Sequence, residues 1–310
     1  MPLLSRKRLI LAKGESSYGT DSSPAGTDAV LVSSLEINPL SGDNVSRELI
    51  RPYLGSFDQL IAKTSVEITF EIELAGSGAA GTAPRYGSIL KACGFAETVS
   101  SGVSVSYQPV SSSFSSVTIY FNVDGVLHKI TGCRGDLSMT CAVAEIPKLK
   151  FTLQGIYNAP TDTAQPSVTY SNQATPLIFR QGNTSSFSFF SYAGALQSVE
   201  FNMANTLLYR ELVGGTKETI ITDRQPAGTV KIEAPTIAAK DFFTTALGTA
   251  TGNLTFLHGT SAGNRVTFTA SQVDITNPTY EDQDSIHMLS VPYVALPTTA
   301  GNDELVLSFT

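Results

Sequence analysis

A short run of residues occurs twice in this chain, at two places about half the chain apart. The first copy is Ser34-Leu35-Glu36-Ile37-Asn38, which Arg47-Glu48-Leu49-Ile50 follows. The second copy is Ser198-Val199-Glu200-Phe201-Asn202, which Arg210-Glu211-Leu212-Val213 follows. Such self-similarity indicates a tandem duplication of a whole β-rich unit. The repeated residues are of kinds that pack and pair, and duplicated β-units without reactive groups are usually built to assemble.

The spacing of 164 positions between Ser34 and Ser198 also separates Val66-Glu67-Ile68 from Val230-Lys231-Ile232. A chain of 310 residues is long enough for two domains that each bury a core. The expected organisation is a turn-rich N-terminal arm outside the core over 1–27, a first β-domain over 28–157, a connecting segment over 158–194, and a second β-domain over 195–310.

Within each half we expect strands, a long loop, another strand, a helix and several further strands. The loops are 41–62 and 204–226, and loops of this length tend to carry function or contacts. The helices are expected near 84–95 and 236–247. In the connecting segment, 176–179 and 186–190 flank Gln181-Gly182-Asn183 and predict a β-hairpin.

The clearest strand pattern lies in 66–74. Apolar side chains alternate there with polar ones, namely Val66, Ile68, Phe70, Ile72 and Leu74 with Glu67, Thr69, Glu71 and Glu73. The apolar side predicts a core face. The glutamates predict a face in contact with water, because unpaired buried carboxylates are too costly. The ordinary interpretation is a solvated sheet face, and the sharper one is a face that lines an aqueous channel.

Composition excludes several classes of protein. Charged residues make up 15% of the chain, against an average of about 25% for soluble domains, which favours a surface covered by copies or partners over a Ser/Thr-coated monomer. The net charge of −7 argues against a protein that grips nucleic acid, and the only basic cluster is Arg6-Lys7-Arg8. The apolar run Leu9–Ala12 is too short for a signal peptide, and no stretch approaches a membrane span. We expect a protein that is not secreted by the standard route.

No arrangement of residues predicts chemistry. Cys93, Cys133 and Cys141 lack metal or disulfide spacing and are expected to be buried in a reducing cytoplasm. The three histidines are scattered, and no nucleophile motif is present. We therefore expect no enzyme, no cofactor and no metal. A glycan- or receptor-binding β-module, such as an adhesin domain, is the alternative, although the absence of tryptophan disfavours it.

Several phrases of the chain resemble one family. The opening Ala12-Lys13-Gly14-Glu15-Ser16-Ser17-Tyr18-Gly19-Thr20-Asp21 leads through Pro24 to Asp28-Ala29-Val30-Leu31-Val32, and 46–51 is followed by Leu54-Gly55 and the strand 66–74. In these phrases the chain resembles the tail tube proteins of long-tailed bacteriophages. The resemblance covers the first half directly and the second half through the internal repeat.

The resemblance implies a mainly β fold with two tandem β-sandwich domains, each with one flanking α-helix. It implies a virion structural protein, assembled in the bacterial host cytoplasm, whose rings stack into the hollow tail tube for DNA passage. Since six copies of the fold form a ring in such tubes, a duplicated chain predicts homotrimeric rings with pseudo-sixfold symmetry. The expected partners are other copies of the chain, a tape measure protein, a tail terminator and distal tail or baseplate proteins, with double-stranded DNA passing without specific binding and no membrane.

Two sets of residues are candidates for functional surfaces. The residues expected to face the channel are Glu67, Thr69, Glu71, Glu73, Thr229, Lys231 and Glu233. The residues expected at contacts between rings or subunits are Arg47, Glu48, Arg51, Tyr53, Arg210 and Glu211. An acidic channel wall repels phosphate, so DNA would slide along it without sticking.

Overall fold

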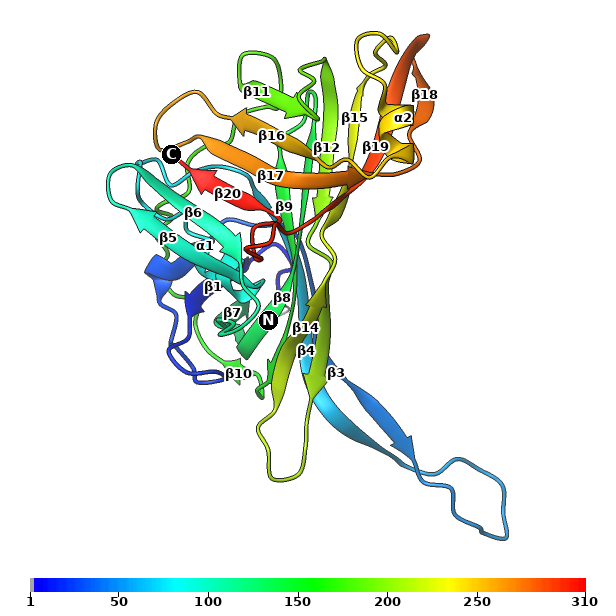
Figure 1. Ribbon diagram of the computed structural model, residues 1–310. Coiled ribbons are helices and arrows are strands. Elements are labelled where there is room, and N and C mark those ends of the chain that lie inside the picture. Colours follow the sequence, from blue (N-terminus) through cyan, green and yellow to red (C-terminus); the bar gives the residue numbers. More distant parts are fainter. Residues whose placement is uncertain (1–2) are drawn as a thin grey trace.

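Eight antiparallel strands form one continuous sheet that runs through the whole chain in the computed structural model, which describes residues 3–310 (Figure 1). We call it the main sheet. Its strands pair in the order β3 (Ser33–Ser46), β4 (Gln59–Glu73), β9 (Lys148–Tyr157), β8 (Val126–Ala142), β12 (Leu196–Asn202), β15 (Ala227–Glu233), β19 (Ile286–Ala295) and β18 (Thr279–Gln283).

Shorter strands and the helices pack against one side of the main sheet (Figure 1). The elements from the first half are β1 (Arg8–Gly14), the 3₁₀ turn Gly26–Asp28, β2 (Ala29–Val30), α1 (Gly87–Ala92), β5 (Phe95–Ser100), β6 (Ser104–Pro109), β7 (Val117–Val123) and β10 (Thr161–Asp162). The elements from the second half are β11 (Thr184–Phe189), α2 (Phe242–Leu247), β16 (Gly252–His258), β17 (Val266–Ile275) and β20 (Val306–Phe309). A separate ribbon consists of β13 (Asn205–Arg210) and β14 (Glu218–Arg224). The mainly β prediction is confirmed.

Alternation along β4 fixes which face of the main sheet is buried. Its apolar residues from Val66 to Leu74 are at most 3% exposed, and the intervening polar residues stay in contact with solvent. The neighbouring strand β9 buries Leu149, Phe151 and Leu153 in the same layer. The rings of Phe70 and Phe151 lie 5.8 Å apart across the two strands. The core face predicted from the sequence is therefore confirmed.

Strand β8 passes from the main sheet to the packing layer at a bulge. The ladder between β8 and β9 shifts register between Thr131 and Arg134, and Gly132 there has a φ of +63°. A Cβ on Gly132 would lie 2.8 Å from the Tyr18 ring, so only glycine fits this position. Because of this bend, one strand pairs with β7 and β9 and then reaches β12.

Both predicted long loops are largely β-hairpins. Strand β3 extends to Ser46 and strand β4 begins at Gln59, so the first loop shortens to 47–58. Strands β13 and β14 occupy most of the second predicted loop and are joined by 211–217. The turn-forming residues 41–44 do not end β3, because two register shifts between Asn38 and Asp43 absorb them. These loop predictions were wrong.

Two further predictions are wrong because the strands concerned pair with strands far away in the sequence. The hairpin predicted over 176–190 does not form, since β11 pairs with β16 and 176–179 form no strand. The arm is not outside the core: Ile10 and Leu11 of β1 are at most 1% exposed and pair with β7. Met1 and Pro2 of that arm lie outside the described residues. The predicted helices are shorter than expected but lie in the predicted segments.

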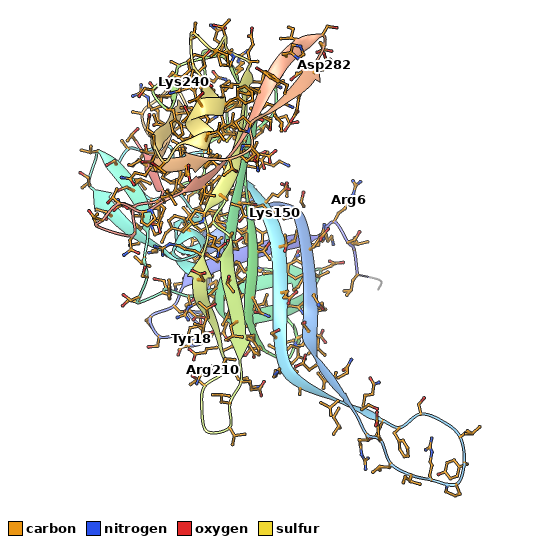
Figure 2. All side chains as sticks on the ribbon, turned by 45° about the vertical axis from the view of Figure 1, so that its right-hand side comes forward. Arg6, Tyr18, Lys150, Arg210, Lys240 and Asp282 are labelled. Atoms are coloured by element: carbon orange, nitrogen blue, oxygen red, sulfur yellow. The ribbon has the colours of Figure 1, made fainter. Side chains whose placement is uncertain are left out.

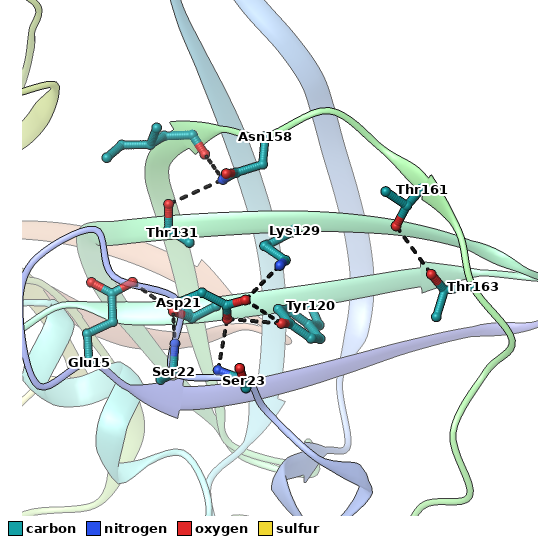
Figure 3. Close-up of polar contacts among 12 residues, drawn as sticks. Glu15, Asp21, Ser22, Ser23, Tyr120, Lys129, Thr131, Asn158, Thr161 and Thr163 are labelled. Atoms are coloured by element: carbon teal, nitrogen blue, oxygen red, sulfur yellow. Dashed lines mark hydrogen bonds and ion pairs between the residues drawn. The ribbon is translucent and has the colours of Figure 1, made fainter.

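A carboxylate in the arm ties it to the packing layer. Asp21 accepts hydrogen bonds from the Lys129 Nζ at 2.6 Å, the Tyr120 hydroxyl at 2.7 Å and the Ser23 N–H at 2.8 Å (Figure 3). Burial by itself would raise the pKa of Asp21, but these bonds together outweigh it and hold the pKa below its ordinary value.

Asp21→Asn is expected to lower the free energy of unfolding by about 1–2 kcal/mol at pH 7. Since the folded-state pKa lies below the ordinary 3.8, the carboxylate stabilises the fold above that pH, and this stabilisation is lost as pH falls through the folded pKa. Urea unfolding at pH 7 and pH 3 measures the change. The two proteins should differ at pH 7, and the difference should be smaller at pH 3 because part of the Asp21 stabilisation is lost below pH 3.8. Asp43→Asn is the control, because the Lys63 and Asp43 side chains of this ion pair are 59% and 67% exposed. It should change the free energy of unfolding by no more than about 0.5 kcal/mol. An equal deficit at both pH values would contradict the assignment.

Candidate assembly surfaces

The solvent side of the main sheet is a continuous polar face. Residues that are directly paired across strands point to the same side of a sheet. The pairs Glu73–Lys148, Lys148–Thr140, Thr140–Glu200 and Glu200–Thr229 therefore carry one face from the first half of the chain into the second. All seven predicted channel residues lie on this face, and all are at least partly exposed.

The polar face carries more glutamate than lysine. Its charged members are Glu36, Glu67, Glu71, Glu73, Asp136, Glu200, Glu233 and Glu281, with Arg134, Lys148, Lys150 and Lys231. The Lys148 Nζ lies 2.8 Å from Glu71 Oε2 and donates to it, and this bond lowers the pKa of Glu71. Lys231 pairs with Glu281. The face is net acidic, but its lysines neutralise part of that charge.

Sequence reasoning missed the two lysines of β9. Lys148 and Lys150 alternate with the buried Leu149 and Phe151, so the same pattern that identified the glutamates of β4 would have found them. Lys150 is labelled on the main sheet in Figure 2.

The tip of the β3–β4 hairpin extends away from the body of the molecule (Figures 1 and 2). Ile50 and Leu54 in this tip are essentially fully exposed, at 104% and 100%. The Arg51 guanidinium lies 4.7 Å from the centre of the Tyr53 ring and 4.2 Å from that of Phe57, which gives the tip local order. Arg47 pairs with Asp58 at 3.2 Å across the base of the tip.

The β13–β14 hairpin lies against the first half of the same chain. The Tyr209 hydroxyl donates to the Thr64 carbonyl at 2.8 Å, and the Tyr18 hydroxyl accepts from the Thr219 N–H at 2.6 Å. At its tip Glu211 pairs with Lys217 at 3.0 Å, and Arg210 is paired with Glu218 across the ladder. The structure therefore places the six predicted contact residues on two separate hairpins and does not bring them together.

The described residues contain no arrangement suited to binding a metal. Across 3–310, no group of three or more His, Cys, Asp or Glu side chains is placed to hold an ion. His258 is buried, and burial lowers its pKa, so the ring serves as a neutral hydrogen-bond partner of Thr184 and the Leu177 carbonyl. The three cysteines are buried free thiols, as predicted. None of the helices in 3–310 has the length and apolar character to cross a membrane.

Comparison with known families decides what these surfaces belong to. A family model described as phage tail tube protein matches residues 5–295, nearly the full chain. The chain belongs to the phage tail tube protein family. No curated protein gives a significant match.

A phage tail tube protein is a structural component of the virion tail and not an enzyme, as the sequence predicted. Membership in the family also implies self-assembly with tail proteins. The polar face, the two hairpins and the edges of the main sheet are thus surfaces of a tube-forming subunit.

Proposed function

We propose that this chain is the major tail tube subunit, and that three copies form a pseudo-sixfold ring. Rings stack into the hollow channel through which DNA passes. The observation that carries the proposal is the strand pairing, which follows the same order in both halves of the chain.

In the first half, the pairing runs from β3 to β4, β9, β8, β7 and β1. In the second half, it runs from β12 to β15, β19, β17, β16 and β11. The elements also occur in the same chain order, and each helix follows the second strand of its run. This correspondence supports two copies of one β-sandwich fold per chain, with β1 and β11 at the start of each.

The correspondence of the halves differs from the sequence repeat at one strand. Ile37 pairs with Ile68, whereas its counterpart Phe201 pairs with Gly228 and not with Ile232. Compared with the sequence repeat, which matches Ile68 to Ile232, the residue that pairs with the repeated position is therefore shifted by four along this strand. The duplicated unit retains its topology even though this strand has slid relative to its neighbour.

We assign the polar face of the main sheet to the channel wall. Eight strands in each of three chains would close a barrel of 24 strands, with the core on the outside and the polar face on the inside. The surplus of glutamate over lysine on this face repels phosphate, which suits DNA that must pass without binding. The predicted channel residues from Glu67 to Glu73 and from Thr229 to Glu233 belong to this wall.

The hairpin tips are proposed to join successive rings. Ile50, Leu54 and Val213 are 104%, 100% and 109% exposed, and an apolar side chain held fully in water is a feature of surfaces that are covered in an assembly. Arg47, Glu48, Arg51 and Tyr53 on the first hairpin, and Arg210 and Glu211 on the second, would then contact the next ring. A tape measure protein, a tail terminator and distal tail or baseplate proteins would occupy the lumen and the two ends of the tube.

Cryo-electron microscopy of the purified, assembled protein tests the proposal. The expected result is a hollow tube with three chains per ring, pseudo-sixfold density, and Lys150 and Glu67 on the inner wall. Six chains per ring would overturn the stoichiometry. A main sheet whose polar face points outward would overturn the channel assignment.

A further inference from the structure

One joint inside the chain shows how two copies of the fold connect. In the main sheet, the first-half segment that lies next to the second half is Ser138–Ala142 of β8. It pairs antiparallel with Ser198–Asn202 of β12. Val199 and Phe201 of β12 are at most 2% exposed at this joint, and so are Met139 and Cys141 of β8. The joint therefore continues both the backbone ladder and the core from one half into the other.

At the outer edge of the main sheet, the second half has strand β18, which corresponds in position to Ser138–Ala142. In the first half, Ile68 pairs with Leu153, and Lys150 pairs with Ser138. In the second half, Gly228 pairs with Tyr293, and Ser290 pairs with Thr279. Since Gly228 is the counterpart of Ile68, the five residues of β18 are the counterparts of Ser138–Ala142.

The edges at both ends of the main sheet are open. Within 3–310, β18 pairs only with β19, and β3 pairs only with β4. Tyr280 of β18 is 56% exposed, whereas its counterpart Met139 is 2% exposed. Leu35 and Ile37 of β3 are only partly buried, although their counterparts Val199 and Phe201 are fully buried. Each edge thus lacks the cover that the same residues have inside the chain.

The β18 edge is acidic and the N-terminal segment beside the β3 edge is basic, with Glu36 the one carboxylate within Ser34–Asn38. Glu281, Asp282 and Asp284 make the β18 edge acidic, and all three are exposed. At the β3 edge, the Arg8 guanidinium donates to the Leu35 carbonyl at 3.2 Å, and Arg6 lies two residues earlier on the same segment. The basic segment at the N-terminus, which is too short for a nucleic-acid site, is therefore placed to meet an acidic strand.

From these observations we infer that β18 of one copy pairs antiparallel with Ser34–Asn38 of β3 in a second copy of this chain. The register is that of the internal joint, so Thr279 lies opposite Asn38 and Tyr280 opposite Ile37. Arg6 and Arg8 of the second copy meet Asp282 and Asp284 of the first. This inference rests on the proposed function and identifies the surfaces through which the ring closes.

Disulfide cross-linking tests the register in the full chain. Asn38→Cys with Thr279→Cys, and Ile37→Cys with Tyr280→Cys, place two adjacent pairs at the joint. Because hydrogen-bonded and non-hydrogen-bonded pairs alternate, at least one of the two has the close spacing that a disulfide needs. The native Cys93, Cys133 and Cys141 are 0% exposed and give no background. Assembly followed by mild oxidation should yield covalent dimers and trimers on a non-reducing gel.

Two controls calibrate this experiment. Ser138→Cys with Asn202→Cys should cross-link within one chain and produce no larger species. Asn38→Cys with Gln283→Cys shifts the register by four residues, roughly 13 Å, and should not cross-link. If tubes form but neither designed pair links, or the shifted pair links equally well, the inferred joint is wrong. Linking beyond the trimer would overturn the proposed stoichiometry and leave the joint intact. A wild-type chain that forms no rings would overturn the proposed function and this inference together.

Charge reversal tests the electrostatic part separately. Arg6→Glu with Arg8→Glu should raise the protein concentration needed for assembly at least tenfold, and light scattering measures this. Adding Asp282→Arg and Asp284→Arg to the same chain should restore assembly. If the combined variant assembles no better than the first, these charges do not meet across the joint.

Discussion

Replacing residues 48–57 with a two-residue Asn-Gly turn is expected to abolish the stacking of rings into tubes while the subunit still folds. The deleted segment is the tip of the β3–β4 hairpin, which contributes no residue to the core. Its apolar side chains, above all Ile50 and Leu54, have no cover in the isolated chain. Removing them removes the contact that we assign to the next ring.

The hairpin itself should tolerate this deletion. Ser46 pairs with Gln59, so Arg47 and Asp58 are the next pair in register, and their ion pair of 3.2 Å remains. Asn-Gly is the preferred connection for a two-residue hairpin turn. Thermal unfolding of the variant should therefore match that of the wild type within the effect of a surface substitution, about 0.5 kcal/mol.

Negative-stain microscopy and analytical ultracentrifugation measure the outcome. We expect rings or free subunits and no tubes, and Ile50→Ser with Leu54→Ser should give an intermediate loss. Leu3→Ser, at a residue that is 56% exposed but lies outside both hairpins, is the matched control and should form normal tubes. Tubes of ordinary length from the deletion variant would show that the tip does not join rings.

The sequence predicted the elements whose patterns are local. The buried face of β4 and the order of strands and helices in each half follow from alternation and turn residues. It could not predict partners that lie far away: β11 pairs with β16 about seventy positions later. The outer part of the β3–β4 hairpin and the β13–β14 ribbon lie in segments predicted as loops, because no alternation of apolar and polar residues marks them in the sequence.

The assembly surfaces were predicted unevenly for the same reason. The glutamates of β4 stand out against an apolar face, and the structure places them on one polar face with their counterparts in β15. Strand β18 was missed because its residues, Thr-Tyr-Glu-Asp-Gln, are polar and charged. Charged side chains are typical of an edge strand that must not pair with the wrong partner, so the feature that hid the strand is also a sign of its position.

Arg224→Ala is expected to destabilise the subunit by about 3–5 kcal/mol, more than any other single substitution considered above. Arg224 lies on β14 and its side chain is 14% exposed. Its guanidinium donates to Glu304 Oε1 at 2.9 Å, to the Val110 carbonyl at 2.6 Å and to Asn302 Oδ1 at 2.7 Å. One side chain thus holds the second hairpin against both the end of β6 and the segment before β20.

The cost arises from the partner that is left behind. The Glu304 side chain is 7% exposed, and its Oε2 atom has no hydrogen-bond partner, so Arg224 is the only cation paired with it among the described residues. Removal of the guanidinium leaves a buried carboxylate without compensation. Replacement of both groups by apolar residues removes the charge along with its partner, so Arg224→Met with Glu304→Leu should recover much of the lost stability.

Urea unfolding of the single and double variants measures this difference. Arg265→Ala is the matched control, because Arg265 is exposed and its side chain bonds only to the Thr260 carbonyl within residues 3–310. It should change the free energy of unfolding by no more than about 0.5 kcal/mol. If Arg224→Ala costs no more than Arg265→Ala, the hairpin is held by its packing, with Ile221 and Thr219 buried against the first half, and not by this ion pair. If the double variant is as unstable as the single one, the loss comes from the hydrogen bonds to Val110 and Asn302, and the buried charge is not its cause.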